Sequence, residues 1–221
     1  MALDLQYGER KIFWGNEGLL VAKLDNTGAK PVAKDIKLVT GLVSVGEMED
    51  QAETSNFAAD DISDHGSKKC ATLLHGEMVF KQLDEGVAED LMGQVKSENG
   101  LGYISTGNYS DFIVQYVNKA RKKTATGVID GYKINVYPCL KATADAGGES
   151  ETDSSDGVDP IQYTLPVSAS GTPAYRSQGK TPASVSYEVW GDQAVEFEKM
   201  MNSELFIMFP DTIVPATATG E

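Results

Sequence analysis

Short stretches in which apolar and polar residues alternate recur along the chain and predict an antiparallel β protein. In residues 111–118, Phe112, Val114 and Tyr116 fall on one face of a strand, because successive side chains of a strand point to opposite faces. Similar alternation, or runs of β-branched residues, predicts strands at 11–14, 19–24, 36–45, 68–83, 102–105, 124–140, 161–169 and 184–190. Glycines at 15 and 18 predict a hairpin turn between the first two strands.

Two stretches have the spacing of helices instead. Val87, Leu91 and Val95 recur at four-residue intervals after Asp84, which predicts a short capped helix over residues 84–95. Asp192 is predicted to cap a final helix whose apolar stripe contains Ala194, Phe197, Met201 and Leu205. Because strands and helices do not alternate regularly, a Rossmann-type or barrel enzyme is disfavoured.

The predicted elements form one domain, which is ordinary for an all-β chain of 221 residues. We place the core at about residues 5–206. Residues 49–66 lie in a long acidic loop, residues 143–159 form a mobile acidic surface loop, and residues 207–221 form a flexible C-terminal tail. The expected fold class is therefore mainly β, as a sandwich or barrel-like sheet with one or two flanking α-helices.

The negative charge is concentrated in two segments. The chain has 33 acidic and 19 basic residues, a net charge of -14. Residues 49–64 and 143–159 each contain six acidic residues and neither Lys nor Arg. This balance argues against a protein that grips nucleic acid, which needs cations to displace phosphate counterions. It suits a soluble protein, or a surface that repels DNA.

Cysteine content and the N-terminal pattern indicate where the protein is made. Cys70 and Cys139 both fall in apolar runs, so we expect two buried free thiols, with a disulfide between them as the alternative. The N-terminus has no basic start followed by an apolar run, which argues against a signal peptide. No stretch approaches ~18 uninterrupted apolar residues, so we expect synthesis in a cytoplasm and no membrane partner.

Candidate catalytic and metal-binding chemistry is sparse, and we expect neither a cofactor nor a metal. The only histidines are His65 and His75, which are too few for a histidine-based catalytic site and are interpreted as surface residues. Residues 153–159 resemble a calcium loop, but with Gly157 at the sixth position Tyr163 would occupy the twelfth, where a bidentate Glu is required.

Lys119, Arg121, Lys122 and Lys123 form the one basic cluster, which we interpret as a basic turn. A solvated turn is the simpler interpretation. The alternative is an inter-subunit contact, in which the cluster pairs with an acidic loop of a neighbouring copy. Such a contact would be individually weak and sensitive to salt.

The order of several weak motifs resembles the major tail proteins of siphophages, the non-contractile long-tailed bacteriophages. The similarity covers about residues 5–206, and its motifs are Tyr7-Gly8, an aromatic-Ala-Asp-Asp stretch at 57–61, residues 76–83 followed by a short acidic helix ending at 90–93, paired central strands at 112–116 and 132–140, and a late strand at 163–173. None of these motifs is catalytic, so the resemblance implies a structural virion protein and not an enzyme.

The resemblance also implies how such a protein assembles. Copies would close into hexameric rings, their inner sheets would join into a continuous barrel, and stacked rings would form a tail tube. DNA would pass through the tube during ejection without specific binding. The implied partners are other copies of the chain and the phage tape measure, tail terminator and distal tail proteins. We expect Phe57, Asp60 and Asp61 to make contacts between rings.

Two other classes of function stay open at the level of sequence. A carbohydrate- or receptor-binding β-sandwich would gather surface aromatic residues in a groove, but Trp14 and Trp190 lie in apolar strands, which favours core packing. An enzyme using paired carboxylates, for example Glu77 and Asp90, is the more distant alternative.

Overall fold

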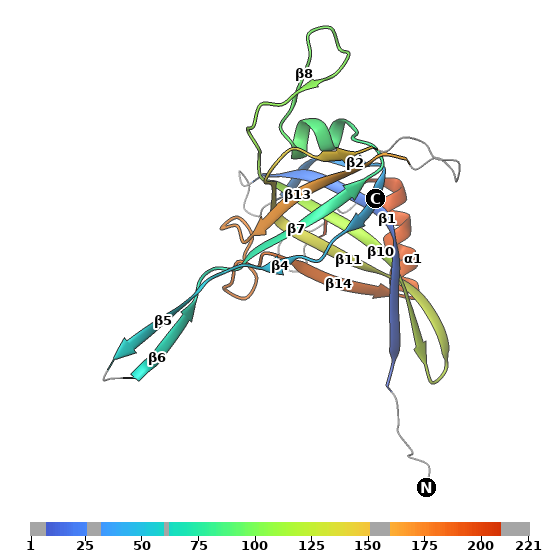
Figure 1. Cartoon of the computed structure of the whole chain (residues 1–221). Coiled ribbons are helices and arrows are strands. Elements are labelled where there is room, and N and C mark those ends of the chain that lie inside the picture. Colours follow the sequence, from blue (N-terminus) through green and yellow to red (C-terminus); the bar gives the residue numbers. More distant parts are fainter. Residues whose placement is uncertain (1–7, 26–31, 60–61, 151–159, 209–221) are drawn as a thin grey trace, which may run out of the picture.

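The structure is a computed structural model, and it describes residues 8–25, 32–59, 62–150 and 160–208. Its centre is an antiparallel ten-stranded sheet (Figure 1). The main path of the sheet, in order, is β2 (Val32–Val39), β1 (Arg10–Asp25), β10 (Phe112–Thr124), β11 (Gly127–Ala142), β13 (Gln162–Ser170), β7 (Leu73–Phe80) and β3 (Leu42–Val45). Three further strands branch from this path: β12 (Gly147–Glu149) on β13, β14 (Val185–Trp190) on β11, and β4 (Glu49–Asp50) on β7.

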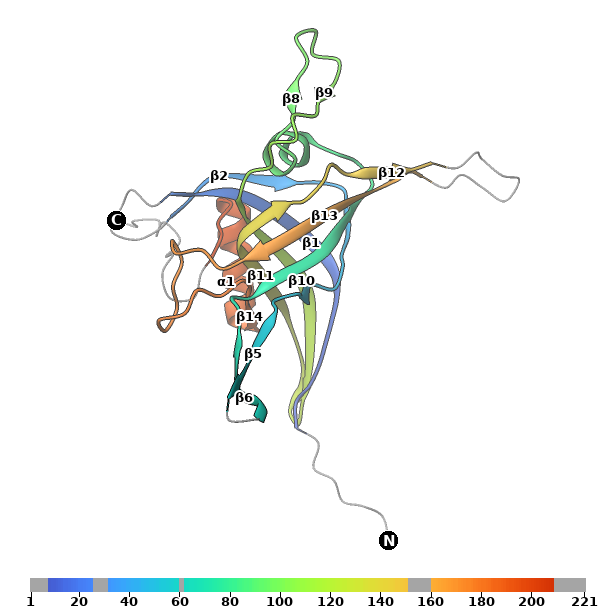
Figure 2. The same cartoon turned by 60° about the vertical axis from the view of Figure 1, so that its left-hand side comes forward.

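Two hairpins and two helices complete the described chain. The hairpins are β5–β6 (Thr54–Ala59 and Ile62–Lys69) and β8–β9 (Val95–Lys96 and Tyr103–Ile104). The helices are η1 (Gly86–Leu91), a π-helix, and α1 (Asp192–Ser203). Figures 1 and 2 show β5–β6 and β8–β9 projecting away from the body in different directions. The mainly β fold with two helices confirms the predicted fold class.

The first two predicted strands are one strand, so the predicted hairpin is wrong. Residues before and after Gly15 both pair with β10, with a register shift between Trp14 and Gly18. Gly15 has φ of 61°, which a glycine adopts at little cost. The side-chain amide of Asn118 donates to Gly15 O at 2.7 Å and holds this irregularity in place. The glycine-rich segment is therefore a bulge within β1.

Both faces of β1 are buried at residues 19–22, which explains the uninterrupted apolar run there. Leu19 and Val21 belong to a core enclosed by the curled sheet and η1. Leu20 and Ala22 belong to a second core on the opposite face, under α1. The curl brings β3 back beside β1, where Asn16 Nδ2 donates to Val43 O at 3.0 Å. The molecule is thus sandwich-like, with one layer of strands shared by two cores.

Two of the predicted strands are each split in the structure. The stretch 36–45 divides at Gly41, whose φ of 84° separates β2 from β3. The stretch 68–83 divides after Lys69, and β7 begins only at Leu73. Cys70 falls in that break and is exposed, so its predicted burial is wrong. Both cysteines are free, and burial raises the pKa of the half-buried Cys139 thiol.

The predicted first helix is shorter than its apolar spacing suggests. Asp84 caps it as expected, since Val87 N donates to the Asp84 carboxylate at 3.0 Å. The helix ends at Leu91, and Val95 lies in β8 instead of on a helical stripe. The final helix is confirmed as α1, and it buries Ala194 and Phe197. It ends at Ser203, so Leu205 of the predicted stripe lies beyond it, and its N-cap is Gly191 and not Asp192.

The acidic segment 143–159 is only partly described, and its described part is not a free loop. Ala146 packs against the enclosed core, and residues 147–149 form β12. Residues 151–159, which carry most of the acidic side chains, lie outside the described residues, as does the tail from residue 209.

Candidate assembly surfaces

The predicted acidic loop contains a projecting hairpin, which we call the β5–β6 arm (Figure 1). Phe57 lies on β5 opposite Gly66 and is 56% exposed. A glycine in the opposing position leaves one side of the ring uncovered. Asp60 and Asp61, the other predicted contact residues, lie outside the described residues. Only the length of the segment indicates this hairpin from the sequence, because its strands are polar.

Asp50 fixes the base of the arm. One carboxylate oxygen of Asp50 accepts hydrogen bonds from Ala52 N at 3.0 Å and Leu73 N at 3.4 Å. The other pairs with Lys69 Nζ at 2.6 Å, and Lys69 holds the pKa of the Asp50 carboxyl below its ordinary value. One side chain therefore contacts both the entrance and the exit of the arm. Since β4 pairs with β7, the arm is also tied to the main sheet.

The basic cluster lies in a strand and not in a turn, so that part of its interpretation is wrong. All four residues belong to β10, and the turn follows at residues 125–126. Lys119 pairs with Glu17 at 2.6 Å, Arg121 with Asp130 at 2.6 Å, and Lys122 with Glu9 at 3.4 Å. This segment lacks a regular alternation of apolar and polar residues, because this end of the β10–β11 hairpin extends beyond both cores. Most of the cluster is therefore neutralised within its own chain.

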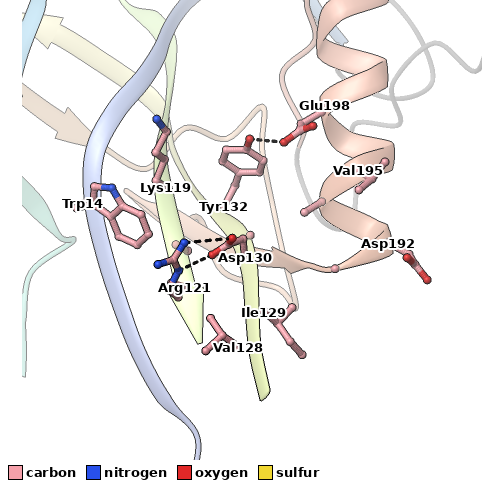
Figure 3. Close-up of a pocket in the computed structure, with 14 residues that line it drawn as sticks. Trp14, Lys119, Arg121, Val128, Ile129, Asp130, Tyr132, Asp192, Val195 and Glu198 are labelled. Carbon is pink, nitrogen blue, oxygen red and sulfur yellow. Dashed lines mark hydrogen bonds and ion pairs between the residues drawn. The ribbon is translucent and has the colours of Figure 1, made fainter. Parts of the chain in front are cut away.

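The part of the β10–β11 hairpin beyond the cores borders a groove against the first turns of α1. The groove has a volume of about 740 Å³, and Figure 3 shows its lining residues. Trp14, Val128 and Val195 are exposed and apolar. Lys119 and Arg121 lie on the strand side, while Asp192 and Glu198 lie on the helix side. The exposed apolar residues thus lie at the margins of the groove, and the Arg121–Asp130 and Tyr132–Glu198 pairs lie between them.

The polar groups of this groove are engaged with one another, which favours a binding surface over a catalytic one. Tyr132 donates a hydrogen bond from its hydroxyl to Glu198. Partial burial and the neighbouring Glu198 carboxylate raise the pKa of Tyr132 to about 12. Arg121 holds the pKa of Asp130 below its ordinary value. These groups stay in single protonation states near neutral pH, so they are poorly suited to proton transfer.

The two tryptophans do not share a groove. Trp14 is 42% exposed and Arg121 lies over its ring at 5.7 Å, so its predicted core packing is wrong. Trp190 is half-buried and is contacted by Lys11 at 5.6 Å and Lys122 at 5.1 Å from the ring centre. Trp190 does not line the groove that contains Trp14. The arrangement therefore lacks the paired surface tryptophans expected of a carbohydrate-binding module.

Other chemistry is not supported by the described part of the chain. Asp90, one member of the suggested carboxylate pair, forms an ion pair with Lys37 at 2.6 Å. Within the described ranges, no group of three or more His, Cys, Asp or Glu side chains is placed to bind a metal ion. Among the same residues, no helix has the length and apolar character needed to cross a membrane.

Of the β8–β9 hairpin, the sequence predicts only β9, within the strand at 102–105, because the spacing of Val95 favours a helix. Four of its apolar side chains are exposed, namely Val95, Leu101, Tyr103 and Ile104. The signal that could have revealed the hairpin is Asn99-Gly100, a hairpin-turn dipeptide between Val95 and the predicted strand at 102–105.

The similarity to known proteins extends over nearly the whole chain. A family model described as phage tail tube protein matches residues 1–218. The chain is 53% identical over 220 residues to the tail tube proteins of Lactococcus phage SK1 and Lactococcus phage p2, and 52% identical to that of Lactococcus phage F4-1. Each alignment covers 98% of this chain and 73% of the relative.

Proposed function

Since this chain belongs to the phage tail tube protein family, and so is a structural protein of the virion tail, we propose that its copies close into hexameric rings that stack into the conduit for DNA during ejection. The ring number and the conduit role come from the resemblance described above. Three structural features support the proposal: open strand edges, a suitable strand direction, and a projecting hairpin with an exposed aromatic residue.

The observation that carries the proposal is a pair of open edges on one group of four strands. These strands are β1, β10, β11 and β14, paired in that order. On one side, residues 10–14 of β1 pair only with β10, because β2 joins β1 from Leu19 onward. On the other side, β14 pairs only with β11 among the described strands. Open edges invite pairing with another chain, and closure into a barrel satisfies them.

Strand direction makes repetition of this group around a ring feasible. Each of the three pairings is antiparallel, so β1 and β14 run in opposite directions. If β14 of one copy lies beside β1 of the next, that new pairing is antiparallel as well. Rotation can therefore repeat the group without a change of pattern, and a head-to-tail contact whose rotation closes yields a ring.

The β5–β6 arm provides a candidate contact between rings. It extends beyond the sheet, it is fixed at its base by Asp50, and it presents Phe57 to solvent. We propose that Phe57, Asp60 and Asp61 contact the adjacent ring. An exposed aromatic ring on a well-anchored arm gains burial on assembly without a large cost of ordering.

The net charge of -14 fits a conduit that DNA crosses without specific binding, because like charges repel. We also propose that the protein has no enzymatic activity, is made in the host cytoplasm, and meets the tape measure, tail terminator and distal tail proteins in the tail. These partners come from the resemblance.

Electron microscopy of the concentrated protein tests the proposal. We expect tubes or stacked rings whose axial views have sixfold symmetry. Analytical ultracentrifugation over a wide concentration range should detect the same self-association. A chain that stays monomeric at every concentration, even with its tail partners added, would refute the proposal. Rings of another symmetry would refute the hexamer alone.

A further inference from the structure

The β8–β9 hairpin has a well-ordered tip that holds an apolar side chain in solvent. Asn99 Oδ1 accepts hydrogen bonds from Ser97 Oγ at 2.7 Å and Leu101 N at 3.0 Å. Ser97 O accepts from Gly100 N at 2.8 Å, and Ser97 N donates to Gly102 O at 2.8 Å. This network fixes the turn, yet Leu101 is 87% exposed. A fixed apolar projection is preorganised for binding, since little conformational entropy remains to be lost.

Leu101 is not an isolated exposed leucine. Val95 and Ile104 are opposite each other in the hairpin and both are 57% exposed, and Tyr103 lies beside them. We call this group, Val95, Leu101, Tyr103 and Ile104, the apolar knob. Scattered exposed apolar residues are common on any surface, but a group gathered on one projecting hairpin indicates an interaction site.

The groove between α1 and the β10–β11 hairpin offers exposed apolar side chains at its margins for such a group to contact. Its apolar residues Trp14, Val128 and Val195 are all exposed. Figures 1 and 2 show that the β8–β9 hairpin and the tip of the β10–β11 hairpin extend from opposite ends of the molecule. A knob and a groove at opposite ends cannot meet within one copy. They can meet between copies that stack head to tail, and this kind of contact propagates into a filament.

Charge adds a direction to this fit. Lys96 lies at the base of the knob, and Glu98 lies near its tip. Neither has an ion pair with any described residue. The groove offers Asp192 on its helix side, and Lys123 lies two residues beyond the groove residue Arg121 on β10; neither has an ion pair among the residues described. One orientation of the knob places Lys96 toward the acidic side and Glu98 toward the basic side. Electrostatic complementarity of this kind sets orientation more than affinity.

We propose that the apolar knob of one copy inserts into the Trp14–Val128–Val195 groove of a copy in the adjacent ring. The proposal rests on the proposed tube function and names a specific axial contact within it. This contact is separate from that of the β5–β6 arm, and it assigns a role to the groove and to a hairpin outside both cores.

Cysteine cross-linking in assembled tubes tests this contact directly. In a background with Cys70→Ser and Cys139→Ala, the chain would carry Leu101→Cys and Val195→Cys together. After mild copper–phenanthroline oxidation, a non-reducing gel should show a ladder of covalent multimers, because each copy links to the next along the axis. Either cysteine alone should give no ladder. The control pair Leu101→Cys and Ile161→Cys should give none either, since Ile161 is exposed at a different site.

A second pair, Ile104→Cys and Val128→Cys, covers the case in which the first variant does not assemble. Tubes without a ladder from any assembling pair, or an equal ladder from the control pair, would overturn the knob–groove contact and leave the tube function intact.

If neither pair assembles, reversal of charge decides the question. Lys96→Glu and Asp192→Lys should each weaken assembly at low salt, and the two together should restore it. Failure of the pair to restore assembly would overturn the contact. Failure of the parent chain to form tubes would instead overturn the proposed function.

Discussion

Lys69 and Asp50 join the two ends of the β5–β6 arm through an ion pair of 2.6 Å between Nζ and Oδ2. Lys69 is the last residue of β6, and Asp50 lies in β4, which pairs with β7 of the main sheet. The same carboxylate also accepts hydrogen bonds from two backbone amides. The base of the arm is therefore held by this side chain together with backbone hydrogen bonds from Gln51 N to Leu73 O and from Cys70 N to Glu53 O, both 2.9 Å, and not by packing of its polar strands.

Replacement of Asp50 by Asn should loosen the arm without unfolding the domain. The amide cannot pair with Lys69, so the amides of Ala52 and Leu73 should exchange hydrogen faster. Because the pKa of the Asp50 carboxyl is lowered in the folded state, its stabilising effect is present above the ordinary value of 3.8 and is lost as pH falls through the folded value. Hydrogen-exchange mass spectrometry of the parent chain across that range should show the same loosening. Glu49→Gln, on the neighbouring exposed position, is the control and should change neither readout.

Gln115 should be essential for docking of the segment after α1. Its fully buried side chain donates from Nε2 to Phe206 O at 3.0 Å and accepts from Met208 N at 3.1 Å. Gln115→Leu would leave both backbone groups without partners in the core under α1. Each buried unsatisfied group costs about 1–3 kcal/mol. We expect chemical denaturation to show a loss of about 2–4 kcal/mol. Gln162→Leu, at an exposed position of β13, should be close to neutral.

The sequence predicted the strands in the interior well because burial there imposes a regular pattern. In β10, Phe112 and Val114 face one core and Ile113 and Val117 face the other, so the alternation survives even though both faces are apolar. The late strands β13 and β14 and the helix α1 were predicted for the same reason. Each of them packs against a core with alternating or periodically spaced apolar residues.

Elements outside the cores were predicted poorly, because nothing there requires apolar alternation. The β5–β6 arm is polar, and its strands are specified by pairing and by the anchor at Asp50. The basic residues from Lys119 onward form a strand because they pair with β1 and β11, against the usual preference of a lysine-rich segment. The groove combines β1, β10, β11 and α1, and a single sequence gives no information on such proximity.

Gly131 should not tolerate a side chain. A Cβ at this position would lie 2.2 Å from Val189 O and 2.7 Å from the Trp190 ring. The first neighbour is backbone within β14, so it cannot move without disturbing the β11–β14 pairing. Gly131→Ala should lower stability by about 1–3 kcal/mol. It should also impair assembly if β14 forms a ring edge. Gly147→Ala is the matched control, because a Cβ there meets nothing within 4 Å.

Replacement of residues 151–158 by a short Gly-Ser linker should leave assembly unchanged at low and high salt. The segment has one apolar residue, Val158, so its burial would gain little, and burial of its acidic groups unpaired would cost several kcal/mol each. The linker should begin after β12, since Ala146 packs on the core. Tube yield measured by sedimentation provides the test. Loss of tubes from a folded variant would instead favour docking of this segment on the basic residues of a neighbour, of which Lys123 has no ion pair among the described residues.

Phe57→Ala should separate folding of the monomer from assembly of the tube. The ring is 56% exposed and pairs across the arm with Gly66, so its removal should alter the unfolding free energy of the monomer by less than ~0.5 kcal/mol. Burial of a phenylalanine side chain contributes ~1.5–3 kcal/mol when it is complete, and about half of this ring remains to be buried. Each contact would then lose about 1 kcal/mol, which corresponds to roughly a fivefold change in an equilibrium constant. Because every copy in a ring loses the same contact, the concentration at which tubes form should rise by at least that factor, as measured by sedimentation and electron microscopy.

Ser55→Ala, on the same strand of the arm, should leave that concentration unchanged. Normal tube formation by Phe57→Ala at the concentration of the parent chain would exclude Phe57 from the contact between rings of the tube. Lower monomer stability of the variant would instead assign the phenyl side chain a role in folding.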